Sequence, residues 1–214
     1  MKKILSILYL FVAVAVIVPP AAASANDGEP TILVLGDSLS AAYGLDKDDG
    51  WVALMRDRLA TEGYPHQVFN ASISGETTSG GLRRLPDLLD RHAPQIVVLE
   101  LGANDGLRAL SLSAMRGNLK QMIQASREAG AQVLLLGMRI PQNYGATYAD
   151  AFFESFQQLA TQMDVAAVEF FLAPIALNQD YFQSDRLHPN AAAQPMLLDE
   201  MWDELAGMLP EKPE

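Results

Sequence analysis

Residues 31–40 read TILVLGDSLS, a run of aliphatic residues that ends at Gly36 and is followed at once by Asp37 and Ser38. A continuous aliphatic run of this length is typical of a strand that is buried on both faces, as in a parallel sheet. Further runs of similar character lie at residues 67–71, 96–101, 132–137 and 166–171. The chain therefore predicts five short strands, with the first one leading into a serine.

Helical patterns separate these runs. Apolar residues recur at helical spacing after Trp51, Ser113, Ala151 and Met196, and we expect a helix in each place. Between residues 77 and 91 the glycines and Pro86 predict a short or kinked helix. Alternation of strands and helices indicates a flavodoxin-like three-layer α/β/α sandwich with a five-stranded parallel sheet in the order 2-1-3-4-5. In such sheets the functional residues gather at the carboxyl ends of the strands.

Composition limits the classes of protein that fit the chain. Its 214 residues are half hydrophobic and predict a single domain over residues 26–214, which we expect to be a monomer. The chain has no cysteine, so disulfides, thiolate metal sites and a cysteine nucleophile are excluded. The net charge of −11 argues against nucleic acid and anionic membranes as partners.

The first 25 residues have the pattern of a secretory signal peptide. Lys2 and Lys3 precede an apolar run at residues 4–18, two prolines break that run, and Ala23 and Ala25 supply the small residues of a cleavage site. The alternative is an uncleaved anchor, but the run is shorter than the roughly 20 residues that cross a bilayer. We therefore predict cleavage after Ala25, export to the periplasm or outside the cell, and no stable membrane insertion.

Three of the predicted strands are followed by residues of types that occur in catalytic sites. Ser38 follows the first strand, Gly75 follows the second, and Asn104 follows the third. Each has an ordinary explanation as a cap or turn residue. Each also has a chemical one: a nucleophile, a backbone N–H open to a substrate oxygen, and a side-chain amide donor.

Before the last helix the chain reads SDRLHPN at residues 184–190, with Asp185 and His188 three residues apart. This spacing can place the carboxylate beside the imidazole, where it would hold the ring in one tautomer. Pro189 favours an extended backbone at His188. The alternative explanation is a chance acid near a surface histidine.

Together these residues are the parts that acyl transfer needs. The G-x-S-x-G signature of an ordinary α/β-hydrolase is matched only in part around Ser38. The histidines at 66, 92 and 188 have no paired metal-ligand spacing, and no phosphate-binding glycine loop is present in the sequence. The sequence thus favours a serine hydrolase without a cofactor or a metal.

On the basis of the motifs around these residues, the chain resembles the SGNH hydrolases of the GDSL group. The resemblance is carried by GDSLS at 36–40, NASISGETT at 70–78, GAND at 102–105 and D-x-x-HP at 185–189. Narrower matches at residues 104–108, 139–145 and 189–195 point to the exported bacterial members with thioesterase, arylesterase and lysophospholipase activity. One departure is Arg186, where relatives usually have glycine.

The resemblance implies a catalytic triad of Ser38, His188 and Asp185. It also implies an oxyanion hole made by the backbone N–H groups of Ser38 and Gly75 and the side-chain amide of Asn104. The expected substrates are small acyl esters, fatty acyl thioesters and lysophospholipids, with residues 138–141 as an apolar wall of the cleft. The alternatives are a carbohydrate O-deacetylase of the same family, a lipid-binding protein that has lost catalysis, and a nucleotide-binding module.

Overall fold

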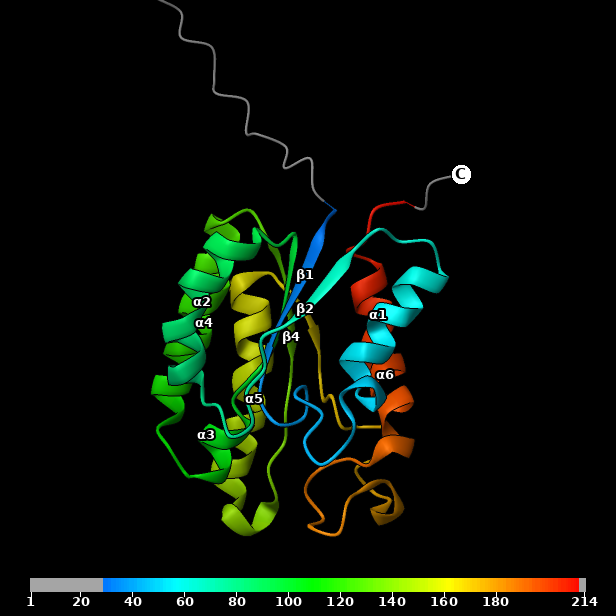
Figure 1. Cartoon of the computed structure of the whole chain (residues 1–214). Helices are drawn as coiled ribbons and strands as arrows, with labels where there is room; N and C mark the ends of the chain where they lie inside the picture. The colour runs from blue at the N-terminus through cyan, green and yellow to red at the C-terminus, as the bar shows by residue number, and fades with distance from the viewer. Residues whose placement is uncertain (1–28, 212–214) are drawn as a thin grey trace, which may run out of the picture.

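Five parallel strands form a single sheet in the order β2-β1-β3-β4-β5, which confirms the predicted topology (Figure 1). The structure is a computed structural model and describes residues 29–211. The predicted signal peptide lies outside the described residues. The strands are β1 (Thr31–Gly36), β2 (Gln67–Asn70), β3 (Ile96–Glu100), β4 (Gln132–Leu136) and β5 (Ala166–Val168).

Helices cover both faces of the sheet. On one face α1 packs beside α6, and on the other α4 packs between α2 and α5 (Figure 1). This two-sided cover explains why β1 and β3 are buried along almost their whole lengths and consist mainly of aliphatic residues. The helices are α1 (Trp51–Thr61), α2 (Thr78–His92), α3 (Ala103–Leu107), α4 (Leu112–Glu128), α5 (Ala146–Met163) and α6 (Gln194–Ala206).

Short 3₁₀ turns interrupt the loops at the ends of the strands. They are η1 (Lys47–Asp49), η2 (Gln142–Tyr144), η3 (Gln179–Tyr181) and η4 (Ala191–Ala193). All of these follow a strand and precede the next helix, so the long loops gather at the carboxyl edge of the sheet.

Two elements differ from the sequence-based prediction. The expected short or kinked helix near Pro86 is α2, a helix of 15 residues with Pro86 exposed on its outer side. Its glycines permit close packing, because a Cβ at Gly81 would collide with the Leu101 side chain. The fifth strand ends at Val168 rather than at residue 171. The backbone N–H of Phe171 instead donates to the carbonyl of Gly137, beyond the end of β4.

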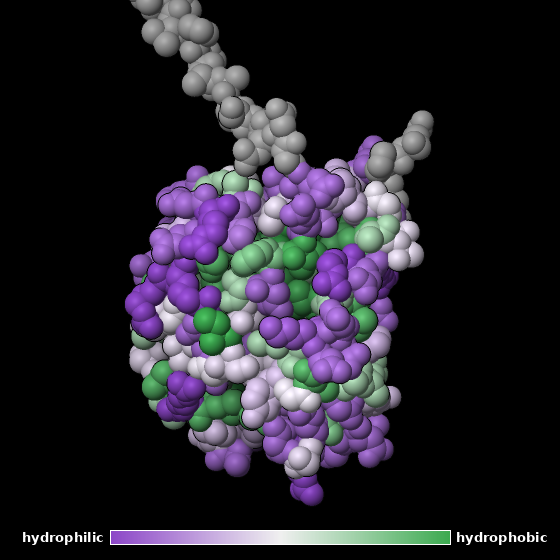
Figure 2. Space-filling model, viewed as in Figure 1, coloured by the Kyte–Doolittle hydropathy of each residue, from purple (hydrophilic) through white to green (hydrophobic). Residues whose placement is uncertain are grey.

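The exposed edge of the sheet is β2. Its residues are mostly exposed, in contrast to the predicted buried strand, and Phe69 is stacked on His92 with ring centroids 3.7 Å apart. Figure 2 shows a largely hydrophilic surface, with apolar side chains gathered in a hollow over β2 between α2 and α1. Within residues 29–211 no helix combines the length and the apolar character that a bilayer crossing requires.

Candidate active site

Ser38 lies directly beyond the carboxyl end of β1, beside the end of β3. The pairing of Gly36 with Glu100 brings these two strand ends together. A Cβ at Gly36 would lie 2.7 Å from Glu100 Oε2, so glycine is needed for this close approach. The serine is therefore presented at the sheet edge where the loops of several strands meet.

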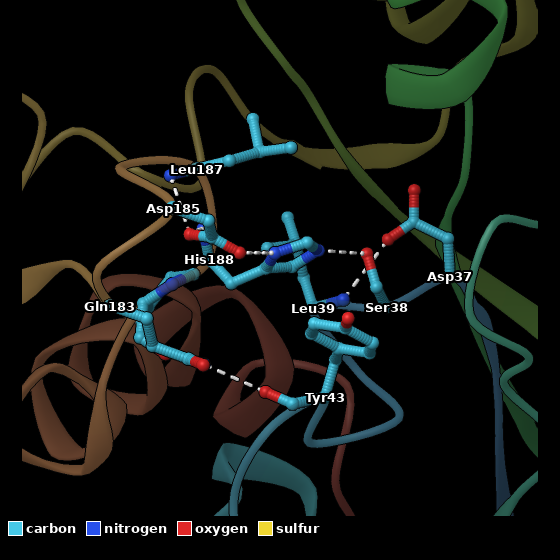
Figure 3. Close-up of polar contacts among 9 residues, drawn as sticks. Asp37, Ser38, Leu39, Tyr43, Gln183, Asp185, Leu187 and His188 are labelled. Carbon is cyan, nitrogen blue, oxygen red and sulfur yellow. Dashed lines mark hydrogen bonds and ion pairs between the residues drawn. The ribbon is translucent and has the colours of Figure 1, made fainter.

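The structure brings Ser38, His188 and Asp185 into one hydrogen-bonded chain (Figure 3). His188 Nε2 is 2.9 Å from Ser38 Oγ, and His188 Nδ1 is 2.6 Å from Asp185 Oδ2. The other oxygen of Asp185 accepts the backbone N–H groups of Leu187 at 2.9 Å and His188 at 3.0 Å. The hydrogen bond from His188, followed by these backbone donors, lowers the pKa of Asp185 to about 2. Asp185 is thus an acceptor that orients the imidazole toward the serine.

The loop that carries Asp185 and His188 is tied to the loop that carries Ser38. The backbone N–H of Gln183 donates to the carbonyl of His188 at 2.7 Å. Its side-chain amide donates to the carbonyls of Tyr43 at 2.7 Å and Pro189 at 3.0 Å. Gln183 therefore sets the distance between segments that are far apart in the sequence.

Tyr43 also touches the imidazole directly. Its ring centroid is 4.4 Å from that of His188 at an interplanar angle of 37°, and Tyr43 lies beside His188 in Figure 3. Neither Tyr43 nor Gln183 was identified from the sequence. Their spacing from the motifs gives no signal, because the contact depends on how two loops meet in space.

Arg186 has a left-handed backbone with φ of 57°. Its N–H donates to the carbonyl of Gln183 at 2.9 Å and so closes the turn from Gln183 to Arg186. A non-glycine residue in this region is sterically disfavoured. This backbone conformation explains why glycine would suit position 186. Arginine at this position carries a small local backbone strain.

Three groups that can stabilise an oxyanion lie near Ser38. Among residues 29–211, the backbone N–H groups of Ser38 and Gly75 donate no hydrogen bond. Gly75 has φ of 80°, and its carbonyl accepts from Arg108 at 2.9 Å. Asn104, at the start of α3, lines the cleft that also contains Ser38 and Gly75.

A cleft of about 360 Å³ opens beside the serine and the imidazole. Its walls are mainly apolar, and the predicted contribution of residues 138–141 is confirmed. The guanidinium of Arg139 lies 3.5 Å from the centroid of the Phe153 ring. The apolar wall residues are Leu39, Ala103, Leu107, Met138, Ile140, Pro141, Leu172 and Leu187.

Two buried carboxyl groups, Asp37 and Glu100, lie behind the serine. Asp37 is 1% exposed and Glu100 is 0% exposed. Burial raises the pKa of Asp37 to about 6, and burial together with the charge of Asp37 raises the pKa of Glu100 well above its usual range. Sequence reasoning missed both, although a glutamate within an apolar strand is a visible signal.

Comparisons with known proteins identify the family of the chain. The GDSL-like lipase/acylhydrolase family model matches residues 34–194. Esterase TesA of Pseudomonas aeruginosa is 50% identical over 179 residues, which cover 84% of this chain and 89% of that protein. Thioesterase 1/protease 1/lysophospholipase L1 of Escherichia coli K12 is 42% identical over 84% of this chain and 85% of that protein. Esterase EstA from Pseudoalteromonas sp., in a structure inhibited by monoethylphosphonate, is 45% identical, with a TM-score of 0.80 over 84% of this chain and 98% of that one.

Proposed function

The chain belongs to the GDSL-like lipase/acylhydrolase family, and on this premise we propose that it is a serine hydrolase that cleaves carboxylic esters and thioesters. The observation that carries the proposal is the chain of contacts from Asp185 through His188 to Ser38, with separations of 2.6 and 2.9 Å. It ends at a cleft with apolar walls. A nucleophile, a base and an orienting acid in this order are what acyl transfer needs.

In the first step Ser38 Oγ attacks the carbonyl carbon of the substrate while His188 Nε2 takes the hydroxyl proton. Asp185 stabilises the imidazolium that results. When the tetrahedral intermediate collapses, the bond to the leaving oxygen or sulfur breaks, and His188 returns its proton to that atom. The acyl group is then held on Ser38 as an ester.

In the second step water attacks the acyl-enzyme, and His188 accepts a proton from it. Collapse releases a carboxylic acid and restores the hydroxyl of Ser38. In both steps the N–H groups of Ser38 and Gly75 and the amide of Asn104 stabilise the oxyanion. The loss of one such donor is typically worth about 2.7–4 kcal/mol in the barrier.

The proposed substrates are esters and thioesters of medium to long acyl chains, including aryl esters and lysophospholipids. Support comes from the apolar walls of the cleft and from the names of the relatives. Each methylene that an acyl chain buries contributes roughly 0.8 kcal/mol. We therefore expect kcat/KM to increase with the length of the acyl chain until the cleft is full.

Hydrolysis of p-nitrophenyl esters from two to sixteen carbons tests this proposal, with kcat/KM measured for wild type and Ser38→Ala. A rise with chain length that disappears in Ser38→Ala supports the acyl hydrolase. A sharp preference for acetyl esters, with release of acetate from acetylated sugars, would instead indicate the carbohydrate O-deacetylase. Binding of acyl chains without turnover would indicate a lipid-binding protein.

We also propose that the protein works in the periplasm as residues 26–214, after cleavage of residues 1–25. Support comes from the lysines, apolar run and small residues at the start of the chain. The intact mass of the exported protein tests this. A membrane-bound product that retains residues 1–25 would contradict it.

A further inference from the structure

Asp37 joins the loop of the nucleophile to one of the proposed oxyanion donors. Its Oδ1 accepts the backbone N–H of Leu39 at 3.1 Å, a contact drawn in Figure 3. Its Oδ2 accepts from Asn104 Nδ2 at 2.9 Å. One buried side chain therefore contacts both the residue after Ser38 and the amide of Asn104.

We propose that Asp37 is a positioning residue that fixes which end of the Asn104 amide faces the substrate oxygen. The two ends of an asparagine amide have nearly the same shape and differ in that one donates and the other accepts. A carboxylate only accepts, so the NH₂ end of Asn104 must face Asp37. One hydrogen of this NH₂ group is bound to Asp37, and the second is left for the oxyanion.

The reversed amide would be harmful to the reaction. With Asn104 turned by half a rotation, its carbonyl oxygen would take the place of the NH₂ group near the developing negative charge. An oxyanion hole stabilises the transition state only when its donors are oriented before the reaction. This inference rests on the proposed function, in which Asn104 donates to the oxyanion.

The surroundings of Asp37 keep its backbone in place. Glu100 Oε2 accepts the backbone N–H of Asp37 at 3.1 Å and the hydroxyl of Ser40 at 2.7 Å. The titratable groups that act on Asp37 are Glu100 from β3 and His188 from the loop before α6. Full burial and the neighbouring charge of Asp37 raise the pKa of Glu100 well above its usual range, which favours the protonated form of Glu100 beside an ionised Asp37. Above about pH 6 Asp37 is then an acceptor only.

The test is a double-mutant cycle with Asp37→Asn and Asn104→Ala, using p-nitrophenyl butyrate at pH 8. An asparagine at position 37 has a single accepting oxygen. The backbone N–H of Leu39 cannot turn, so it keeps this oxygen as its acceptor. The NH₂ group of the new side chain then faces Asn104, and the Asn104 amide turns so that its oxygen accepts from that group. We expect kcat to fall roughly 10²-fold with little change in KM, as for the loss of an oxyanion donor.

The decisive comparison is Asp37→Asn in the Asn104→Ala background. If Asp37 acts through Asn104, the double variant loses less than about threefold more than Asn104→Ala alone. If Asp37 only supports the loop after Ser38, the two losses multiply, and that result would overturn the inference. Should Asp37→Asn not fold, Asp37→Ser allows the same cycle.

A matched control is Asp105→Asn. Asp105 is also a buried carboxylate at this edge, and it accepts from the N–H of Thr78 at 2.9 Å and its hydroxyl at 2.6 Å. Within residues 29–211 no hydrogen bond joins its side chain to the amide of Asn104, so its effect should multiply with that of Asn104→Ala. Ser38→Ala separates the two proposals. Retained hydrolysis in Ser38→Ala refutes the proposed function, whereas its loss together with multiplying effects refutes only the role of Asp37.

Discussion

Substitution of Asp37 by asparagine should shift the stability of the protein, relative to wild type, in favour of the variant as the pH rises, while it makes the enzyme slower. Burial raises the pKa of Asp37 from the ordinary 3.8 to about 6. The protonated carboxyl therefore stabilises the native state fully below pH 3.8, and this stabilisation is lost as the pH rises through about 6. Asparagine does not titrate and is free of this loss.

The size of the effect follows from the two pKa values. A pKa change from 3.8 to about 6 corresponds to about 3 kcal/mol over the full titration. Between pH 4.5 and pH 8 the same linkage gives about 2 kcal/mol in favour of the variant. Loss of the Asp37 charge also lowers the pKa of Glu100, which acts in the same direction.

Urea unfolding at pH 4.5 and pH 8 measures this effect as the difference in the free energy of unfolding between variant and wild type. Comparison of two pH values cancels pH-independent changes, such as the altered hydrogen bonds to Leu39 and Asn104. We expect the difference to grow by about 2 kcal/mol toward alkaline pH. A difference that is equal at both pH values would refute the reasoning that Asp37 carries a buried, unfavourable charge.

Four further substitutions test the site and the loop beside it. Ser38→Ala and His188→Ala should each lower kcat by several orders of magnitude. The double variant should be little worse than either single one, because the effects of residues that act as a unit are not additive. If steady-state kinetics showed that the two losses multiply, that result would contradict a shared role. Asn104→Ala should lower kcat roughly 10²–10³-fold with little change in KM, and an unchanged kcat would remove this residue from the oxyanion hole. Arg186→Gly should relieve the φ of 57° and raise the free energy of unfolding by up to about 1 kcal/mol. A lower melting temperature for this variant would show that its side chain contributes more than the strain costs.

The order of strands was predicted correctly from the sequence, and the residues that we propose as the triad were also found there. Aliphatic runs mark buried strands, and their alternation with helical patterns leaves few topologies for a parallel sheet. The rule that function lies at the carboxyl ends of strands then selected Ser38, Gly75 and Asn104. Asp185 and His188 were found through their close spacing, which is a local property of the chain.

The tertiary structure alone decided how these residues are held. Gln183 and Tyr43 contact each other only because two distant loops cross at the sheet edge. The partnership of Asp37 with Asn104 likewise spans 67 positions and depends on the pairing of β1 with β3. Sequence patterns record local periodicity and burial, whereas the direction of a hydrogen bond and the pKa of a buried carboxyl depend on neighbours that only the folded chain brings together.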